Sequence, residues 1–197
     1  CETFAGFVWV NLDPHAPTLA AHLGPVMAQI DCYRMEQMRR THWVTLEGDW
    51  NWKCVQDNFN ESYHLPFVHP QTRFVMEQSY RDCQFDLYAP HGHARMFMPG
   101  SRPSRSLRGH TDTVLEMMAR ELTYWGLDPE AFRADPLATR EALQKAKRAG
   151  GAAKGYDYSR FHDAQLTDHF HYTVFPNLSF SLKPDGCLSC LLFLLFS

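Results

Sequence analysis

Two histidines and one acid stand close together in the stretch NWKCVQDNFNESYHLPFVHPQT, residues 51–72. His64 and His69 are five residues apart with Pro66 between them, and Glu61 lies three residues before His64. Imidazole is a common metal ligand, and a carboxylate on the same helical face can accept the second ring N–H of a ligating histidine. These residue types indicate part of a metal site. From spacing alone, the alternative that both histidines are surface or core residues at a helix end stays open.

The spacing of the two histidines constrains the backbone between them. On an ideal helix, residues five apart point about 140° away from each other, so one continuous helix could not present both rings to one ion. Pro66 lacks a backbone N–H and disfavours helical conformation at Leu65. We therefore expect a helix over residues 54–65 to bend or end there, which lets His69 turn back toward His64.

Other candidate ligands are more weakly placed. Cys187 and Cys190 have the spacing of half a zinc site, but the sequence holds no second pair of this kind. Two histidine pairs, one near a turn and one on an expected strand, are interpreted as structural: His91 with His93, and His169 with His171.

Composition limits the classes of function. A chain of 197 residues with 45% hydrophobic residues is long enough for one domain with a sizeable core. The net charge of −3 gives no basic surface for nucleic acid or for an anionic membrane. Six dispersed cysteines favour reduced thiols and a cytoplasmic location. The apolar end CLSCLLFLLFS has about half the length that a membrane span requires. We expect no nucleic-acid or membrane partner.

The elements that must position the motif follow from periodicity and turn residues. Alternation predicts strands and helical spacing predicts helices, in this order: strand 5–12, a helix from Pro25 to about Arg39, one or two strands within 41–53, helix 54–65, strands 84–90 and 93–100, and strand 170–182. Strands at both ends with helices between them indicate an α+β fold on an antiparallel sheet.

A helical insertion of about residues 104–155 interrupts these strands. Thr113 and Glu116 have the spacing of a capping box, and the Asp-Pro pairs at 128–129 and 135–136 have the form of an N-cap followed by proline. Glycines follow the last helix and predict a flexible link. We expect this insertion to be peripheral.

The motif N-W-K…N-F-x-E-x-Y-H…H-P resembles the mononuclear iron motif of the Rieske non-haem iron oxygenases, in the catalytic domain of the large (alpha) subunits of aromatic-ring-hydroxylating dioxygenases and their relatives. GFVWVNLDP near the start and LTDHFHYTVFPNLSF near the end are similar to the family as well. The resemblance implies a partial catalytic domain over residues 1–186. It also implies a helix-grip-like α+β fold, an antiparallel sheet with helices on one face, truncated at both ends.

The resemblance assigns roles to the motif residues. His64 and His69 would be ligands of Fe(II), and Asn58 would lie near the iron. Glu61 would be the acid that links the iron site to the Rieske cluster of a neighbouring subunit. The family's third ligand is an aspartate, expected beyond residue 197. Asp163 and Asp168 are the nearest carboxylates within the chain, but they precede the strand that the ligand should follow.

The resemblance also implies an activity and partners. The enzyme would activate O₂ at Fe(II) to hydroxylate an aromatic ring or a related organic substrate, such as an amine. Electrons would come from NAD(P)H through a ferredoxin or reductase and a Rieske [2Fe–2S] cluster, in a homotrimer or an α3β3 assembly. The Rieske domain is absent from this sequence and would precede residue 1, so we expect the chain alone to be inactive.

Two rival functions and one irregular segment remain at this point. The same fold could bind an apolar ligand without redox chemistry, or a metal site with three ligands could serve a zinc hydrolase. Residues 187–197 form an atypical apolar tail that does not resemble the family. We interpret this tail as a buried strand or as a segment not native to the domain.

Overall fold

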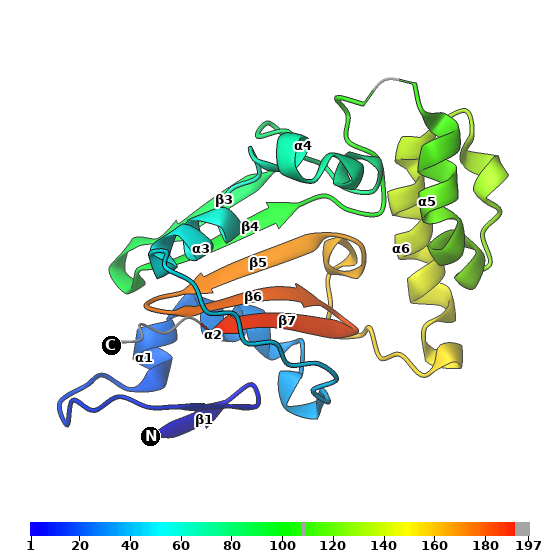
Figure 1. Ribbon diagram of the computed structural model, residues 1–197. Helices are drawn as coiled ribbons and strands as arrows, with labels where there is room; N and C mark the ends of the chain where they lie inside the picture. Colours follow the sequence, from blue (N-terminus) through cyan, green and yellow to red (C-terminus); the bar gives the residue numbers. More distant parts are fainter. Residues whose placement is uncertain (108, 192–197) are drawn as a thin grey trace.

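The computed structural model describes residues 1–107 and 109–191, the last two of them by their backbone alone. Its main feature is a five-stranded antiparallel sheet in the order β3-β4-β5-β6-β7 (Figure 1). The strands are β3 (Gln84–Tyr88), β4 (His93–Met98), β5 (His169–Val174), β6 (Leu178–Lys183) and β7 (Gly186–Leu191). β4 and β5 are neighbours in the sheet although about 70 residues separate them, so the helical insertion leaves the sheet and returns to it.

The hairpin of β3 and β4 confirms the two strands expected there, and Gly92 ends the connection with a φ of 70°. The single strand expected over residues 170–182 is wrong, because the chain reverses at residues 175–177 and forms two strands. β5 and β6 pair from Phe170 with Leu182 to Val174 with Leu178. Proline at position 176 cannot donate to a strand ladder, so the alternating pattern continues on a second strand.

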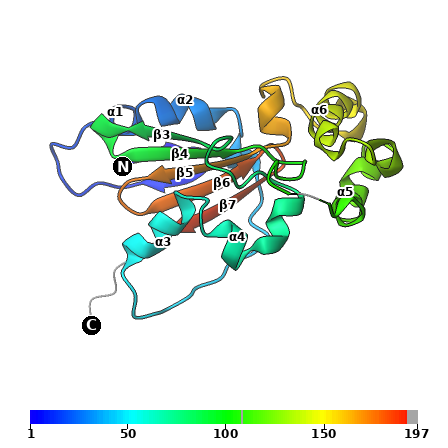
Figure 2. The same ribbon diagram turned by 90° about the horizontal axis from the view of Figure 1, so that it is seen from above.

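Helices cover both faces of the sheet (Figure 2). Short helices α1 (Leu19–Leu23) and α2 (Pro25–Asp31) lie on one face, and α3 (Trp52–Phe59) and α4 (Leu65–Val68) lie on the other. The expectation of helices on one face is therefore wrong. The α+β class itself is confirmed.

The face beneath α1 and α2 holds the main core. Its buried side chains come from alternate positions of β5 and β6, since successive strand residues point to opposite faces. Val26 and Ile30 of α2 are buried against this face, and so is Tyr33, which follows the helix. α2 begins at Pro25 as expected but ends at Asp31, short of Arg39, because Arg34 takes a left-handed backbone conformation with a φ of 49°.

The N-terminal segment is a two-stranded hairpin instead of one strand over residues 5–12. β1 (Glu2–Phe4) and β2 (Phe7–Trp9) pair around Ala5 and Gly6, which both have positive φ. Gly6 has no Cβ, and an added one would lie 3.0 Å from the backbone of Glu36. The aromatic side chains of this hairpin pack on the main core.

The strands expected within residues 41–53 are wrong. Residues 38–48 form neither helix nor strand, and Trp43, Val44 and Leu46 are more than 60% exposed. Alternation gives a segment strand propensity, but a strand also requires a neighbouring strand with which to pair.

The insertion contains α5 (Thr111–Tyr124) and α6 (Thr139–Gly150), which stand beside one end of the sheet (Figure 1). Asp128 and Asp135 accept hydrogen bonds from the backbone two residues ahead, as N-caps of short 3-10 turns. The capping box is wrong, because α5 begins at Thr111 and already includes Thr113.

Buried polar contacts connect the insertion to the sheet. Arg140 of α6 forms a bidentate ion pair with Asp168, which is fully buried at the start of β5. Thr139 donates to the carbonyl of Ser101 at 2.8 Å, and Lys147 donates to the carbonyl of Leu166 at 2.7 Å. These contacts anchor α6 to the segments that enter and leave the sheet.

The apolar C-terminal segment contributes β7, which pairs with β6 from Leu178–Leu191 to Lys183–Gly186. Residues 192–197 and the side chain of Cys190 lie outside the described part of the structure. The prediction for the pair Cys187 and Cys190 therefore falls on residues that the structure does not fully describe. Among the helices of the described residues, none is long and apolar enough to cross a membrane.

Candidate metal centre

The motif lies on α3, on α4 and on the connection between them. α3 ends at Phe59, and Asn60 caps it by donating its backbone N–H to the carbonyl of Asp57. The helix expected over residues 54–65 therefore ends earlier, and it does not end at Pro66. Pro66 lies in the first turn of α4 instead, where no helical partner for its missing N–H is required.

A side-chain contact fixes the end of α3 against the sheet. Thr173 of β5 donates its hydroxyl hydrogen to the side-chain oxygen of Asn60 at 2.6 Å. One residue later comes Glu61. The start of the connection that carries the acid and the first histidine is thus anchored to the central strand of the sheet.

Glu61 orients His64 through both of its carboxylate oxygens. One oxygen accepts the backbone N–H of His64 at 3.1 Å, and the other is in hydrogen-bond contact with the ring nitrogen Nδ1. Both side chains are mostly buried, with exposed fractions of 20% and 15%. This contact engages Nδ1 and leaves Nε2 as the nitrogen available to a metal, which is the arrangement of a histidine ligand with a carboxylate behind it.

His69 stands next to His64, at the end of α4. The two ring centroids are 5.7 Å apart and the ring planes meet at 76°. Two imidazoles that bind one ion through nitrogens about 2.1 Å away place their centroids roughly 5 Å apart. The break between α3 and α4 therefore brings together two histidines that a continuous helix would hold on different sides.

The other residues considered from the sequence are placed differently. Asn58 is exposed on α3. Asp168 is engaged by Arg140, and Asp163 accepts from Arg148 at 2.7 Å. Among the described residues, no third histidine, cysteine or carboxylate joins the pair to form a set of three ligands. The donor set present is thus two imidazoles with one supporting carboxylate.

His93 has a structural role, as expected. It is 2% exposed, its Nε2 lies 2.9 Å from the carbonyl of His22, and its Nδ1 accepts the backbone N–H of Phe175. Burial lowers its pKa below the usual value and so favours the neutral ring.

The second strand pair differs from this pattern. Burial lowers the pKa of His171 to about 4 and that of His169, with a smaller effect of Lys183, to about 3. His171 Nδ1 is buried without a hydrogen-bond partner in the described part of the chain, and its ring lies 6.0 Å from that of Phe59. The same is true of Gln56 Nε2 and Ser179 Oγ, which lack partners and are buried.

Sequence patterns alone did not indicate Gln56 or Ser179, and they led to the interpretation of His171 as structural. A signal was available, since the strand HFHYTV alternates polar and apolar residues. Such alternation normally means that the polar face meets water. The polar face here is instead covered by α3, whose packing the sequence did not reveal.

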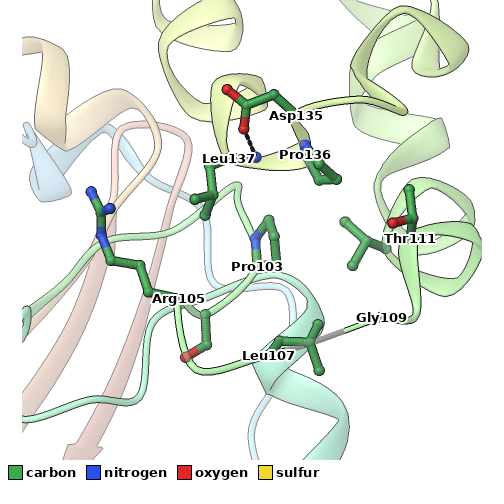
Figure 3. Close-up of a pocket in the computed structure, with 10 residues that line it drawn as sticks. Pro103, Arg105, Leu107, Gly109, Thr111, Asp135, Pro136 and Leu137 are labelled. Carbon is green, nitrogen blue, oxygen red and sulfur yellow. Dashed lines mark hydrogen bonds between the residues drawn. The ribbon is translucent and has the colours of Figure 1, made fainter.

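Two cavities accompany the fold. One of about 200 Å³ is bounded by Pro103 and Leu107 on one side and by Pro136 and Leu137 on the other (Figure 3). It belongs to the helical insertion, and none of its lining residues comes from the histidine motif. A smaller one of about 90 Å³ is lined by Asn60 together with residues of β3 and β4.

Comparison with known proteins gives three relatives of one kind. The chain is 32% identical over 71 residues to the carnitine monooxygenase oxygenase subunits of Escherichia coli K12 and O157:H7, and 30% identical over 71 residues to that of Acinetobacter pittii. Each match covers 35% of this chain and 19% of the relative, so the chain spans about a fifth of the length of these proteins. No solved structure matches the chain.

A longer match comes from the family of ring hydroxylating alpha subunits. The profile of the catalytic domain of that family matches residues 35–193, which include the histidine motif and all five strands of the main sheet. The match covers most of the chain, and the chain therefore belongs to the family of ring hydroxylating alpha subunits, catalytic domain.

Proposed function

We propose that this chain is the mononuclear-iron part of a Rieske-type oxygenase, with His64 and His69 as two ligands of Fe(II). The supporting observation is the contact of Glu61 with His64 Nδ1 beside the ring of His69. Membership in this family suggests which metal the two histidines bind. In such sites two histidines and one further carboxylate bind one face of Fe(II) and leave positions open for other ligands. The third ligand is assigned to the sequence after residue 197.

The residues of the chain would hold, orient and shield the site. Fe(II), when bound, supplies O₂ activation, with electrons from a Rieske [2Fe–2S] cluster. Glu61 holds the His64 ring through Nδ1 and leaves Nε2 free to bind the metal. Asn58 lies one turn before Glu61, and we assign it to the surroundings of the iron. α3 and the Leu65 side chain of α4 cover part of the sheet beside this motif.

The intact enzyme would act with partners. We propose a helix-grip-like domain in a homotrimer or α3β3 assembly that receives electrons from a ferredoxin or reductase. The substrate would be an aromatic ring or a related organic molecule, and the similarity to carnitine monooxygenase oxygenase subunits supports an amine among these candidates.

Anaerobic calorimetric titration with Fe(II) tests the assignment. We expect weak binding by the chain, because two imidazoles fill only part of the coordination sphere. His64→Ala and His69→Ala should each reduce the affinity by about 10-fold or more, the range seen when ligand support is lost. His15→Ala is the matched control, since His15 is exposed far from the motif in sequence. If both motif variants bind Fe(II) as the unchanged chain does, the proposed ligands are wrong.

A further inference from the structure

The sheet face beneath α3 is apolar on β3 and β4 and polar on β5 and β6. Paired positions form a row across four strands, in which Leu87 faces Ala94, Ala94 faces Thr173, and Thr173 faces Ser179. The row is thus apolar on β3 and β4 and polar on β5 and β6. The adjacent row on the same face repeats this order with Phe85, Met96, His171 and Ser181.

The polar half of this face carries buried groups without partners. Gln56 Nε2, His171 Nδ1 and Ser179 Oγ are buried and make no hydrogen bond to the described residues. Buried polar side chains in folded proteins are nearly always paired with protein or water, so each exception requires an explanation. Three exceptions where α3 faces the sheet indicate a place where a bound molecule completes the hydrogen bonds.

The pairing of β5 with β6 and the position of α3 place these three groups around Thr173. Ser179 is the cross-strand partner of Thr173, and His171 is two positions before Thr173 on the same face. Diagonal neighbours of this kind lie about 7 Å apart. Gln56 is one helical turn before Asn60, whose side chain contacts Thr173 at 2.6 Å. The three groups therefore lie close to one another, next to the end of α3 that leads into Glu61.

Space for a ligand exists on the apolar half. The cavity of about 90 Å³ is lined by Asn60 on one side and by residues of β3 and β4 on the other: Phe85, Asp86, Leu87, Ala94, Arg95 and Met96. Because strand residues alternate, the side chains of Asp86 and Arg95 point to the opposite face of the sheet, and the side chains toward α3 are apolar. Ala94 is the cross-strand partner of Thr173, so the cavity adjoins the polar half directly. An apolar space next to unpaired polar groups matches a molecule with an apolar body and one polar substituent.

We propose that Gln56, His171 and Ser179 recognise a carboxylate or carbonyl oxygen of the substrate, whose apolar body lies over β3 and β4. The identification of this ligand as the substrate rests on the proposed oxygenase function. An amide, a neutral imidazole and a hydroxyl can each donate a hydrogen bond to such an oxygen. Burial favours the neutral form of His171, and this ring can still donate from Nδ1.

Binding of small probes to the metal-free chain, followed by two-dimensional NMR, tests the proposal. Benzoate and benzamide carry an acceptor oxygen on a ring, whereas toluene presents the same ring without one. We expect benzoate or benzamide to bind at least 10-fold more tightly than toluene, with shifts in the signals of β5 and β6. A stronger effect for benzoate would identify a carboxylate, and a stronger effect for benzamide a carbonyl. Equal binding of toluene would overturn the proposal.

Variants separate recognition from folding. Ser179→Ala and Gln56→Leu should each weaken the preferred probe by about 10-fold, the usual effect of one lost hydrogen bond. Ser179→Ala should keep or raise the thermal midpoint, because it removes a buried hydroxyl without a partner. Ser104→Ala is the matched control: Ser104 is equally buried and donates to Glu77 at 2.5 Å, so its loss should lower the midpoint by roughly 2–4 °C.

A fall of the midpoint in Ser179→Ala as large as in Ser104→Ala would show that the Ser179 hydroxyl already has a partner in the fold, and would overturn the assignment. Because the probes are tested without iron, this result is independent of the Fe(II) titration. A chain that binds Fe(II) through its histidines but prefers toluene would keep the proposed function and refute only the recognition of an oxygen.

Discussion

The two faces of the five-stranded sheet are equally buried in its centre and differ in chemistry. Beneath α1 and α2, Tyr172 and Phe180 are 1% exposed within a continuous apolar core. Beneath α3, Thr173 and Ser179 are 6% and 5% exposed, but they are polar, and the Ser179 hydroxyl has no partner among the described residues. Natural proteins depart from consistent packing mainly at functional sites. The first face therefore stabilises the domain, and the second face is where we place the proposed substrate site.

The largest effect should follow from a truncation in the apolar face. Phe180→Ala leaves a cavity in the main core, and large-to-small changes of this kind cost about 3–5 kcal/mol in the free energy of unfolding. Chemical denaturation measures the change. Phe85→Ala is the comparison on the other face, where Phe85 is 44% exposed, and it should cost less than about 1 kcal/mol. Similar losses at both positions would contradict the difference between the faces.

A smaller effect is expected from the ion pair that anchors the helical insertion. Arg140→Ala leaves the fully buried carboxylate of Asp168 without its cation, and breaking such a pair costs about 3 kcal/mol. Arg133→Ala is the control, because Arg133 pairs with Asp112 at the surface, where solvent screens an ion pair and its loss changes stability little. Equal denaturation midpoints for the two variants would show that the ion pair does not anchor the insertion to the sheet and that the insertion is peripheral.

The polar face should also make stability depend on pH. Burial lowers the pKa of His171 from 6.5 to about 4, so the unfolded chain takes up this proton first as the pH falls. The stability that the neutral His171 ring contributes is complete above about pH 6.5 and is lost as the pH falls toward 4. In His171→Phe, the loss of stability across this window should be smaller by roughly 1–3 kcal/mol. Thermal unfolding at several pH values measures this dependence of stability on pH.

His42→Phe is the control, because His42 is exposed, and this variant should leave the pH dependence unchanged. If His171→Phe has the same pH dependence as the unchanged chain, the His171 ring is hydrated in the fold.

Local sequence signals predicted much of this structure. The motif around His64 predicted the family, and turn residues predicted the β3–β4 hairpin and the start of α2 at Pro25. These features depend on residues near one another in the chain, where proline and glycine restrict the backbone directly.

Features that depend on tertiary contacts were not predictable in the same way. The segment with Trp43 and Leu46 alternates like a strand, yet no strand forms there in the described structure, because alternation does not supply a partner. The break of α3 at Asn60 depends on a hydrogen bond to Thr173, more than 100 residues away. The burial of the polar face depends on the packing of α3 against β5, so polar residues that alternate along this strand are covered by a helix and do not face water.

We propose that Glu61, His64 and His69 form part of one iron site, in which His64 would bind the metal through Nε2. Co(II) in place of Fe(II) allows a direct test, since proton NMR of the cobalt-loaded chain reveals the ring N–H of each ligating histidine as a strongly shifted signal. We expect two such signals, one lost in His64→Ala and one in His69→Ala. Glu61→Ala should make the His64 signal exchange rapidly with water, because its Nδ1–H loses its acceptor. Shifted signals that persist in both histidine variants would contradict the claim.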